Sequence, residues 1–230
     1  MEEKKNKAPA KQETAITANP KHAAVNDALL LPLGEEFEAD LTALMEAEDA
    51  ESGDPIIIAI YDTDNFMHIN TDYGYDVGDR VLIASGQHYK KFEAEGARLY
   101  RLGGDQFGFI FHGEQTKEDV FLLMEAMRST LEIKEPNGTP VTISVGIAEA
   151  FEDATRVQEL MRKADSAMMR AKMTGRNKVS LAREEKMVPK TSHYTQAQLQ
   201  SLTKLSKREG IGEAILLREA LDMLLKKYRA

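Results

Sequence analysis

The sequence predicts an α/β domain with a mixed sheet and flanking helices, followed by a small helical module. A continuous apolar run at 56–60 is typical of a buried central strand. Residues 141–147 alternate strictly between apolar and other side chains, which predicts a second strand. Segments with helical periodicity stand before, between and after these strands, and this order favours a layered α/β arrangement.

Before and after the central strand, apolar spacing predicts helices. A first helix contains Leu33, Phe37, Leu41 and Leu44, which recur every three to four residues. The strand at 56–60 follows Gly53-Asp54-Pro55 and precedes an acidic loop. A further helical segment extends over about 78–93.

A hairpin and two more helices complete the predicted domain. Strands at 98–102 and 107–111 flank Gly103-Gly104, which is a hairpin signal. Residues 120–131 are predicted to be helical. Thr155 with Gln158 is typical of a capping box, and the helix behind it continues to a stop at Gly175.

Composition shifts divide the chain into four segments. We predict a disordered arm at 1–24, a folded domain at 25–182, a charged linker at 183–190 and a helical module at 191–230. Residues 183–230 contain ten Lys/Arg and six Asp/Glu, a net charge of +4. Because the whole chain has a net charge of −8, residues 1–182 have a net charge of −12. The tail is therefore electrostatically distinct from the body.

The composition also excludes several classes of protein. The chain of 230 residues has no cysteine, which rules out disulfides, thiolate metal sites and cysteine nucleophiles. No stretch approaches the roughly 20 apolar residues of a membrane helix, and the charged start does not resemble a secretory signal. We therefore expect a cytoplasmic protein without a membrane partner.

The acidic loop and the Gly-Gly hairpin together suggest a metal and phosphate site. Asp62-Thr63-Asp64 follows the central strand, where carboxylates are well placed to hold a divalent cation, although a lone Asp-x-Asp is more often a capped loop. Asp105 adds a carboxylate on a tight turn behind Gly103-Gly104, whose bare backbone allows close approach of a phosphate. Carboxylates on adjacent strands are suited to a Mg²⁺ ion that bridges a nucleotide triphosphate.

Five ordered blocks over roughly residues 27–182 resemble the GGDEF domain of diguanylate cyclases. The blocks are Asp62-Thr-Asp-Asn-Phe-Met-His-Ile-Asn70 with Tyr73-Gly-Tyr-Asp-Val-Gly-Asp79, Arg101-Leu-Gly-Gly-Asp-Gln-Phe107, Ser144-Val-Gly-Ile147, Ala164-Asp-Ser-Ala-Met168, and Ala171-Lys-Met-Thr-Gly-Arg-Asn177. The resemblance implies a palm-like fold similar to nucleotidyl cyclases. It also implies a reaction in which two GTP molecules, bound by facing domains of a homodimer, are joined into cyclic di-GMP with release of pyrophosphate.

The resemblance further implies a role for each matching residue. Asp62, the Thr63 carbonyl and Asp105 would hold Mg²⁺ or Mn²⁺, with Asp105 also near the attacking hydroxyl. Other matching residues would bind GTP: Asn70 and Asp79 at the guanine edge, Gly103 and Gly104 beneath the phosphates, and Lys172 and Arg176 as their counter-charges. Without the matching blocks, the two cations would be read as an ordinary solvated helix end.

Several departures from the family pattern bear on catalysis. Gln106 stands where active members carry Glu; it keeps the shape of that catalytic position but cannot act as a base or as a strong cation ligand. Met67 replaces a Lys that faces phosphate, and the early Asp-x-Leu-Thr segment is only faintly echoed at 27–34. The Arg-x-x-Asp inhibitory site is absent, so we predict no product inhibition at 93–97.

The C-terminal module resembles the ribbon-helix-helix family of intertwined DNA-binding dimers. Thr195 and Gln198 predict a capped helix start, and apolar residues recur through two short helices on either side of Gly210. Two such helices cannot bury their apolar faces alone, so a second copy is expected to cover them. The ribbon matches poorly and offers Lys190, Thr191 and His193 for DNA contact.

Two functions of different class follow from these patterns. The chain is a homodimeric diguanylate cyclase, with activity limited by Gln106, or a regulator in which a degenerate cyclase domain binds GTP or cyclic di-GMP and controls a DNA-binding module. For the tail, DNA binding, a dimerisation clamp and packing on the body all remain open.

Overall fold

The computed structural model describes residues 23–48, 53–94, 96–182, 192–209 and 212–228. The chain divides into two compact units, residues 1–184 and 185–230.

The first unit is built on a five-stranded mixed sheet. Its strands are β1 (Ile56–Thr63), β2 (Ala97–Gly103), β3 (Gln106–His112), β4 (Ile143–Glu149) and β5 (Lys178–Leu181), in the order β2-β3-β1-β4-β5. β1 is antiparallel to β3 and β4, and β4 is parallel to β5. All eight residues of β1 are buried, which confirms the predicted central strand.

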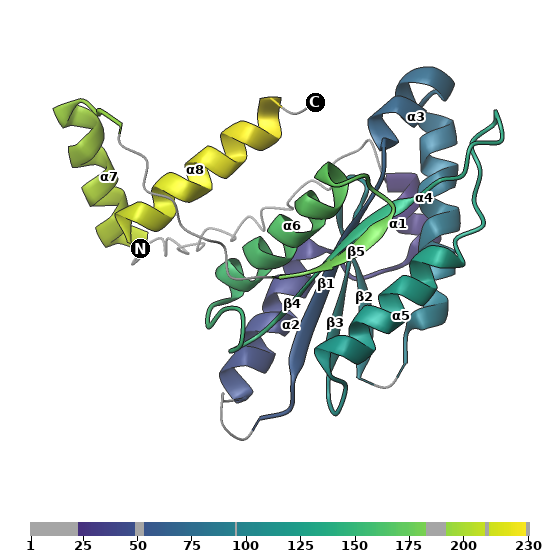
Figure 1. Cartoon of the computed structure of the whole chain (residues 1–230), viewed down its shortest axis with the longest axis horizontal. Helices are drawn as coiled ribbons and strands as arrows, with labels where there is room; N and C mark the ends of the chain where they lie inside the picture. The colour runs from purple at the N-terminus through teal and green to yellow at the C-terminus, as the bar shows by residue number, and fades with distance from the viewer. Residues whose placement is uncertain (1–22, 49–52, 95, 183–191, 210–211, 229–230) are drawn as a thin grey trace, which may run out of the picture. The chain divides into compact units, whose positions relative to one another are not determined.

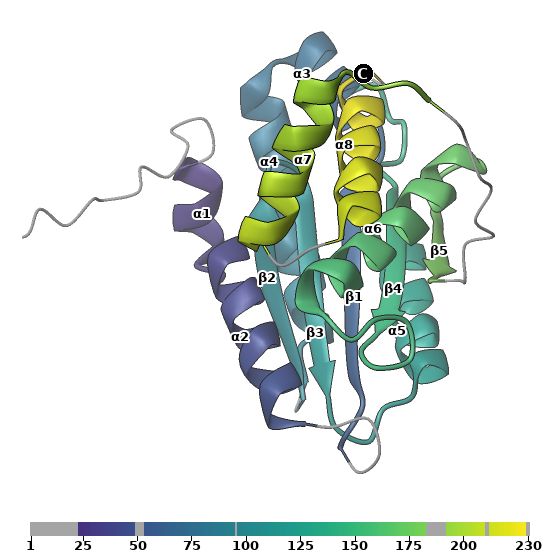
Figure 2. The same ribbon diagram turned by 90° about the vertical axis from the view of Figure 1, so that its left-hand side faces the viewer.

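Helices cover both faces of this sheet, as Figures 1 and 2 show. The helices are α1 (Ala23–Leu29), α2 (Gly34–Ala47), α3 (Phe66–Tyr73), α4 (Tyr75–Tyr89), α5 (Lys117–Ser129) and α6 (Val157–Met173), with a 3-10 turn at Lys90–Phe92. Ile56, Ile58 and Ile60 of β1 share a core with residues of α2 and α6. Ile57, Ala59 and Tyr61 point the other way, into a core with α1, α3, α4 and α5.

Several element boundaries differ from the prediction. α1 begins at Ala23, so the last two residues of the predicted 1–24 arm are helical; residues 1–22 and the predicted linker at 183–190 lie outside the described residues. α1, α3 and β5 were not predicted. α6 has no capping box: its N-cap is Arg156, with no side-chain cap hydrogen bond, so the motif predicted at Thr155 is wrong.

α6 can lie close to β4 because the residue of β4 that faces it, Gly146, has no side chain. A Cβ atom added to Gly146 would lie 2.0 Å from the backbone oxygen of Ala164 and 2.3 Å from the backbone nitrogen of Met168. Backbone atoms of a helix cannot give way as a flexible side chain does. Gly146 therefore sets the distance between α6 and the sheet.

The second unit contains α7 (Gln196–Glu209) and α8 (Glu213–Tyr228). The capping box predicted at the start of α7 is present: Thr195 Oγ1 accepts from the Gln198 backbone nitrogen at 3.2 Å, and the Gln198 side chain accepts from the Thr195 backbone nitrogen at 2.9 Å. Thr203 on α7 donates to Glu213 on α8 at 2.7 Å. Large apolar side chains nevertheless face solvent in this unit: Leu199, Leu221, Met223, Leu224 and Leu225.

The predicted DNA-contact residues are only partly visible. Lys190 and Thr191 lie outside the described residues. His193 is exposed, and residues 192–195 form no strand. Among the helices that the structure describes, none has the length and apolar character needed to cross a membrane.

Candidate functional site

The site forms where β1 ends beside the turn of the β2–β3 hairpin. Asp62 and Thr63 are the last two residues of β1, and Gly104 and Asp105 form the turn. Strand register pairs Asp62 directly with Gln106 on β3. The antiparallel pairing thus brings the end of β1 and the hairpin turn to one edge of the sheet.

The two glycines at this hairpin have backbone conformations that favour glycine. Gly103 has φ +128° and Gly104 has φ +55°, conformations that residues with a Cβ rarely adopt. An added Cβ would meet nothing within 4 Å at either position, so space alone does not demand glycine there. The turn therefore presents open backbone beside Asp105.

Two carboxylates and one amine form the charged centre of the site. The Lys172 ammonium, near the end of α6, donates to Asp62 Oδ1. Burial, together with the charge of Asp105 and a hydrogen bond with it, raises the pKa of Asp62 to about 7 against the opposing effect of Lys172. One ammonium thus balances two carboxylates incompletely, which is an arrangement that favours binding of a further cation.

The raised pKa of Asp62 predicts a pH-dependent cost to folding. Between pH 3.8, the ordinary pKa of an aspartate, and about pH 7 the folded state binds more protons than the unfolded state, so stability falls as pH rises through this window. Asp62→Asn removes this cost. We therefore expect the free energy of unfolding of the variant, relative to that of the native chain, to increase by about 2–4 kcal/mol as the pH rises from 4 to 8.

Thermal denaturation with EDTA at several pH values measures this effect. The melting temperature of Asp62→Asn minus that of the native chain should grow with pH by several degrees. Asp54→Asn, at an exposed position, serves as the control and should show no such trend. A difference for Asp62→Asn that stays constant from pH 4 to 8 would contradict the assignment.

Asp64, two residues beyond Asp62, has a separate structural role. It is buried and accepts hydrogen bonds from Thr142 Oγ1 at 2.8 Å, Ser144 Oγ at 2.7 Å and the Asn177 backbone nitrogen at 3.0 Å. The last bond ties down the loop after α6, in which Arg176 and Asn177 have φ of +60° and +48°. Asp64 therefore anchors the loop that carries the exposed Arg176.

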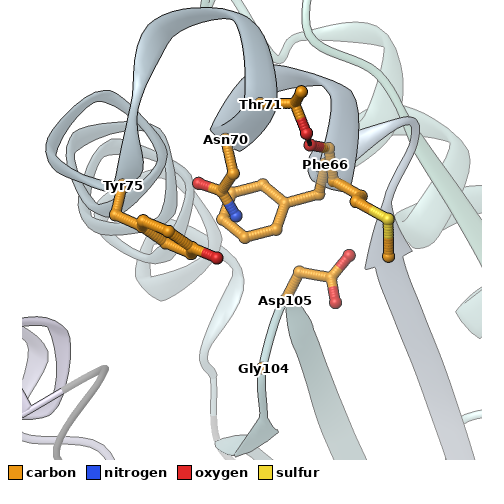
Figure 3. Close-up of a pocket in the computed structure, with 7 residues that line it drawn as sticks. Phe66, Asn70, Thr71, Tyr75, Gly104 and Asp105 are labelled. Carbon is orange, nitrogen blue, oxygen red and sulfur yellow. Dashed lines mark hydrogen bonds between the residues drawn. The ribbon is translucent and has the colours of Figure 1, made fainter.

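A pocket of about 390 Å³ opens beside the hairpin turn (Figure 3). It is lined by Phe66, Met67, Asn70, Thr71, Tyr75, Gly104 and Asp105. Asn70 projects from α3, and its buried Oδ1 has no hydrogen-bond partner. A Cβ added to Gly78 on α4 would lie 1.9 Å from that oxygen, so Gly78 leaves the room that the Asn70 amide occupies.

Arg101 links the hairpin turn to the rest of the unit, and sequence reasoning did not identify it as a site residue. It is buried and donates to Gly104 O at 2.7 Å and to Asn26 Oδ1 at 2.5 Å. Burial lowers the pKa of Arg101, and the charges of Asp79 and Asp105 oppose the shift. The one available signal was its place inside an apolar strand, two residues before the first of the glycines.

The predicted site residues thus fall into three groups. Asp62 and Lys172 meet Asp105 at the charged centre, next to Thr63 and opposite Gln106. Asn70, Gly104 and Asp105 line the pocket, which Asp79 and Gly103 do not. Asp79 instead lies in the electrostatic environment of Arg101.

The oxygen ligands at the charged centre suit a small hard cation, but they include fewer carboxylates than a site that surrounds the ion completely. Carboxylate and carbonyl oxygens are the ligands that Mg²⁺ and Mn²⁺ prefer. Within the described ranges, no three or more His, Asp or Glu side chains converge as a metal site. Asp62 and Asp105 therefore fit such an ion as a two-carboxylate site, to which Gln106 adds no charge.

The chain belongs to the GGDEF family. Residues 34–178 match the family model described as "Diguanylate cyclase, GGDEF domain". Residues 187–229 match the model of the ribbon-helix-helix domain. Both resemblances noted in the sequence are thereby confirmed.

Among curated proteins, the chain is similar to diguanylate cyclases of Escherichia coli strain K12. It is 31% identical over 163 residues to diguanylate cyclase DgcM, covering 70% of this chain and 39% of that protein. It is 30% identical over 140 residues to diguanylate cyclase DgcN, covering 59% of this chain and 34% of that protein. The chain thus spans between a third and two fifths of the length of these relatives.

Solved structures show the same fold. The GGDEF domain of YfiN (TpbB) from Pseudomonas aeruginosa superposes with a TM-score of 0.63 at 25% identity, covering 68% of this chain and 99% of that one. The coiled coil and GGDEF domain of DgcB from Caulobacter crescentus, in complex with c-di-GMP, gives a TM-score of 0.60 at 27% identity, covering 68% and 84%. The predicted palm-like mixed α/β fold is confirmed.

Proposed function

We propose that this chain condenses two GTP molecules into cyclic di-GMP in the cytoplasm, with Mg²⁺ or Mn²⁺ as cofactor and with a low turnover set by Gln106. The observation that carries the proposal is the meeting of Asp62 and Asp105 beside Lys172, next to a pocket lined by Asn70. A charged centre beside a pocket of this size suits a nucleoside triphosphate.

The reaction joins the 3′-oxygen of one GTP to the α-phosphorus of the other. The bond to the bridging oxygen of the β-phosphate breaks, pyrophosphate leaves and the hydroxyl loses its proton; the same exchange at the second pair of groups closes the ring. Asp62, Asp105 and the Thr63 carbonyl would hold the divalent ion, which supplies positive charge against the triphosphate. Asp105 would lie near the reacting hydroxyl.

The other residues bind and orient the substrate in this proposal. Lys172 and Arg176 neutralise phosphate charge, and Arg can do so with two parallel hydrogen bonds. Gly103 and Gly104 give the phosphates access to bare backbone. Asn70 and Asp79 recognise the guanine edge, since an amide offers a donor and an acceptor and a carboxylate accepts from N1–H and the exocyclic amine.

Incubation of the purified full chain with GTP and either Mg²⁺ or Mn²⁺ tests the proposal. Chromatography with mass detection should show cyclic di-GMP and pyrophosphate accumulating together. Asp105→Asn, which keeps the shape of the side chain, should abolish the product. GTP that binds but is not converted would overturn the catalytic proposal and leave nucleotide binding in place.

A homodimer held by the second unit would bring two such sites together. Leu221, Leu224 and Leu225 of α8 are each more than 40% exposed. Two short helices rarely form a sufficient core alone, so a second copy is the natural cover for this face. Because each product molecule needs two bound GTP molecules, dimerisation and turnover should fail together.

Leu224→Glu is expected to weaken this dimer. A carboxylate at an apolar interface has no compensating partner, so the molar mass of the variant under native conditions should shift from that of a dimer towards that of one chain. Light scattering after size exclusion measures the mass, and the rate of cyclic di-GMP formation should fall with it. Leu122→Glu, a similarly exposed leucine on α5, is the control. An unchanged mass for Leu224→Glu would contradict the assignment of this face.

A second candidate function is supported by Gln106 and by the ribbon-helix-helix match at 187–229. In this reading the first unit binds GTP or cyclic di-GMP without efficient turnover, and the dimeric tail binds DNA through Lys190, Thr191 and His193. Gel shifts of the full chain on DNA should then weaken steeply with salt, because phosphate contacts release counterions. Alanine at the three positions together should reduce the shift; undiminished binding would exclude that contact set.

A further inference from the structure

The pocket beside Asp105 has one apolar wall and one polar wall. Phe66, Met67 and Tyr75 supply carbon and sulfur surface, whereas Asn70 and Asp105 supply polar atoms. Figure 3 shows Asn70, Tyr75 and Asp105 around a common space, with the ring of Tyr75 at one side. Such a division suits a flat heteroaromatic group, which presents faces without hydrogen-bonding atoms and an edge rich in them.

Tyr75 is held at the pocket mouth by a sharp corner of the backbone. Gly74, directly before it, has φ +86° and ψ 161° and is both the C-cap of α3 and the N-cap of α4. A residue with a Cβ would be strained in this conformation. Tyr75 is therefore the first residue of α4, and its position is fixed by the packing of two helices rather than by a long loop.

The two large side chains of this wall are mostly exposed. Tyr75 is 60% exposed and Met67 is 68% exposed, although both line the pocket. A flat ligand that contacts this wall would bury apolar surface that now contacts water. A tyrosine ring loses little conformational freedom when it makes such a contact, and a thioether adapts its shape to the ligand.

We propose that Tyr75 stacks on the guanine base of GTP in this pocket, with Met67 as an adaptable apolar contact at the rim. This inference rests on the proposed function and adds a substrate-binding residue to it. The base faces contact the ring of Tyr75, while the base edge meets the Asn70 amide. The triphosphate continues past Gly104 towards the charged centre of Asp62, Asp105 and Lys172.

Binding measurements with two ligands test the stacking role. Calorimetry on the full chain compares GTP with inorganic tripolyphosphate, which has the same phosphates but no base. Tyr75→Ala should weaken GTP binding by about 5- to 100-fold, the range found when an aromatic that stacks on a base is removed. Tyr75→Phe should bind GTP as the native chain does, and tripolyphosphate binding should be the same in all three proteins.

Matched controls separate this inference from the proposed function. Tyr194→Ala makes the same change at an exposed tyrosine of the second unit and should leave GTP affinity unchanged. Native affinity for GTP in Tyr75→Ala, or an equal loss for both ligands, would overturn the stacking role while leaving the cyclase proposal standing. A native chain that binds GTP but forms no product would overturn catalysis alone, and one that binds no GTP would overturn both.

Discussion

Gln106→Glu is expected to raise the rate of cyclic di-GMP formation at saturating GTP by about 10- to 100-fold, which corresponds to roughly 1.4–2.8 kcal/mol of transition-state stabilisation. The physical reason is the strand register. Gln106 is paired directly with Asp62, so the two side chains project from the same face of the sheet. A carboxylate at position 106 would be the third in a charged centre that now contains two, those of Asp62 and Asp105.

The same change should have an opposite effect on stability without metal. A third carboxylate would add repulsion where burial and Asp105 already raise the pKa of Asp62 to about 7. Gln106→Glu should therefore melt below the native chain in EDTA and recover when Mg²⁺ is added. Gln87→Glu makes the same change on the exposed surface of α4 and controls for net charge. An unaltered rate for Gln106→Glu would count against our account of this residue.

Gly146→Ala should cause the largest loss of stability of any single methyl addition in the first unit. The new Cβ would lie 2.0 Å and 2.3 Å from backbone atoms of α6, so the helix must move away from β4. Overpacking in cores typically costs about 1–3 kcal/mol, and rigid backbone partners place this site at or above the upper end of that range. We expect the melting temperature to fall by roughly 10 °C.

The displacement should also reach the site, because α6 carries Lys172. Thermal denaturation measures the loss of stability. The affinity for GTP, measured at a temperature where the variant remains folded, reports whether the Lys172 ammonium has been displaced. Gly212→Ala is the matched control, since an added Cβ there meets nothing within 4 Å. A Gly146→Ala protein that melts with the native chain would show that α6 does not rest on the sheet as described.

Much of the fold could be predicted because its strongest signals are local. A continuous apolar run such as 56–60 is typical of a strand in the middle of a sheet that is covered on both faces, and β1 lies in that position. The hairpin around Gly103-Gly104 was likewise found from its glycines. α6 was visible because its buried residues recur at helical spacing along 17 residues.

The missed elements are those whose stability comes from distant contacts. β5 has four residues, and its parallel pairing with β4 leaves no pattern in so short a segment. α3 has eight residues and is separated from α4 only by Gly74. The capping motif expected at Thr155 does not form, because α6 begins at Val157 and its N-cap is Arg156, which makes no side-chain cap hydrogen bond.

The sequence motifs selected residues that the structure brings together, whereas the contacts that position them could not be predicted. The motif order allowed Asp62, Asp105 and Lys172 to be selected, and these three meet in the structure. The buried position of Arg101 depends on α1 and on the hairpin turn folding together, which no spacing reports. The pocket wall at Tyr75 likewise arises from the corner between two helices.

The hydrogen bonds around Asp64 have a consequence for the timing of substrate capture. Consecutive left-handed residues at Arg176 and Asn177 would be an improbable arrangement in a free loop. The Asn177 amide donates to the buried Asp64 carboxylate at 3.0 Å, so contacts within the protein hold that arrangement. In the proposed function, a phosphate that approaches Arg176 would meet a loop already shaped by these contacts, and little of the binding energy would be consumed in ordering it.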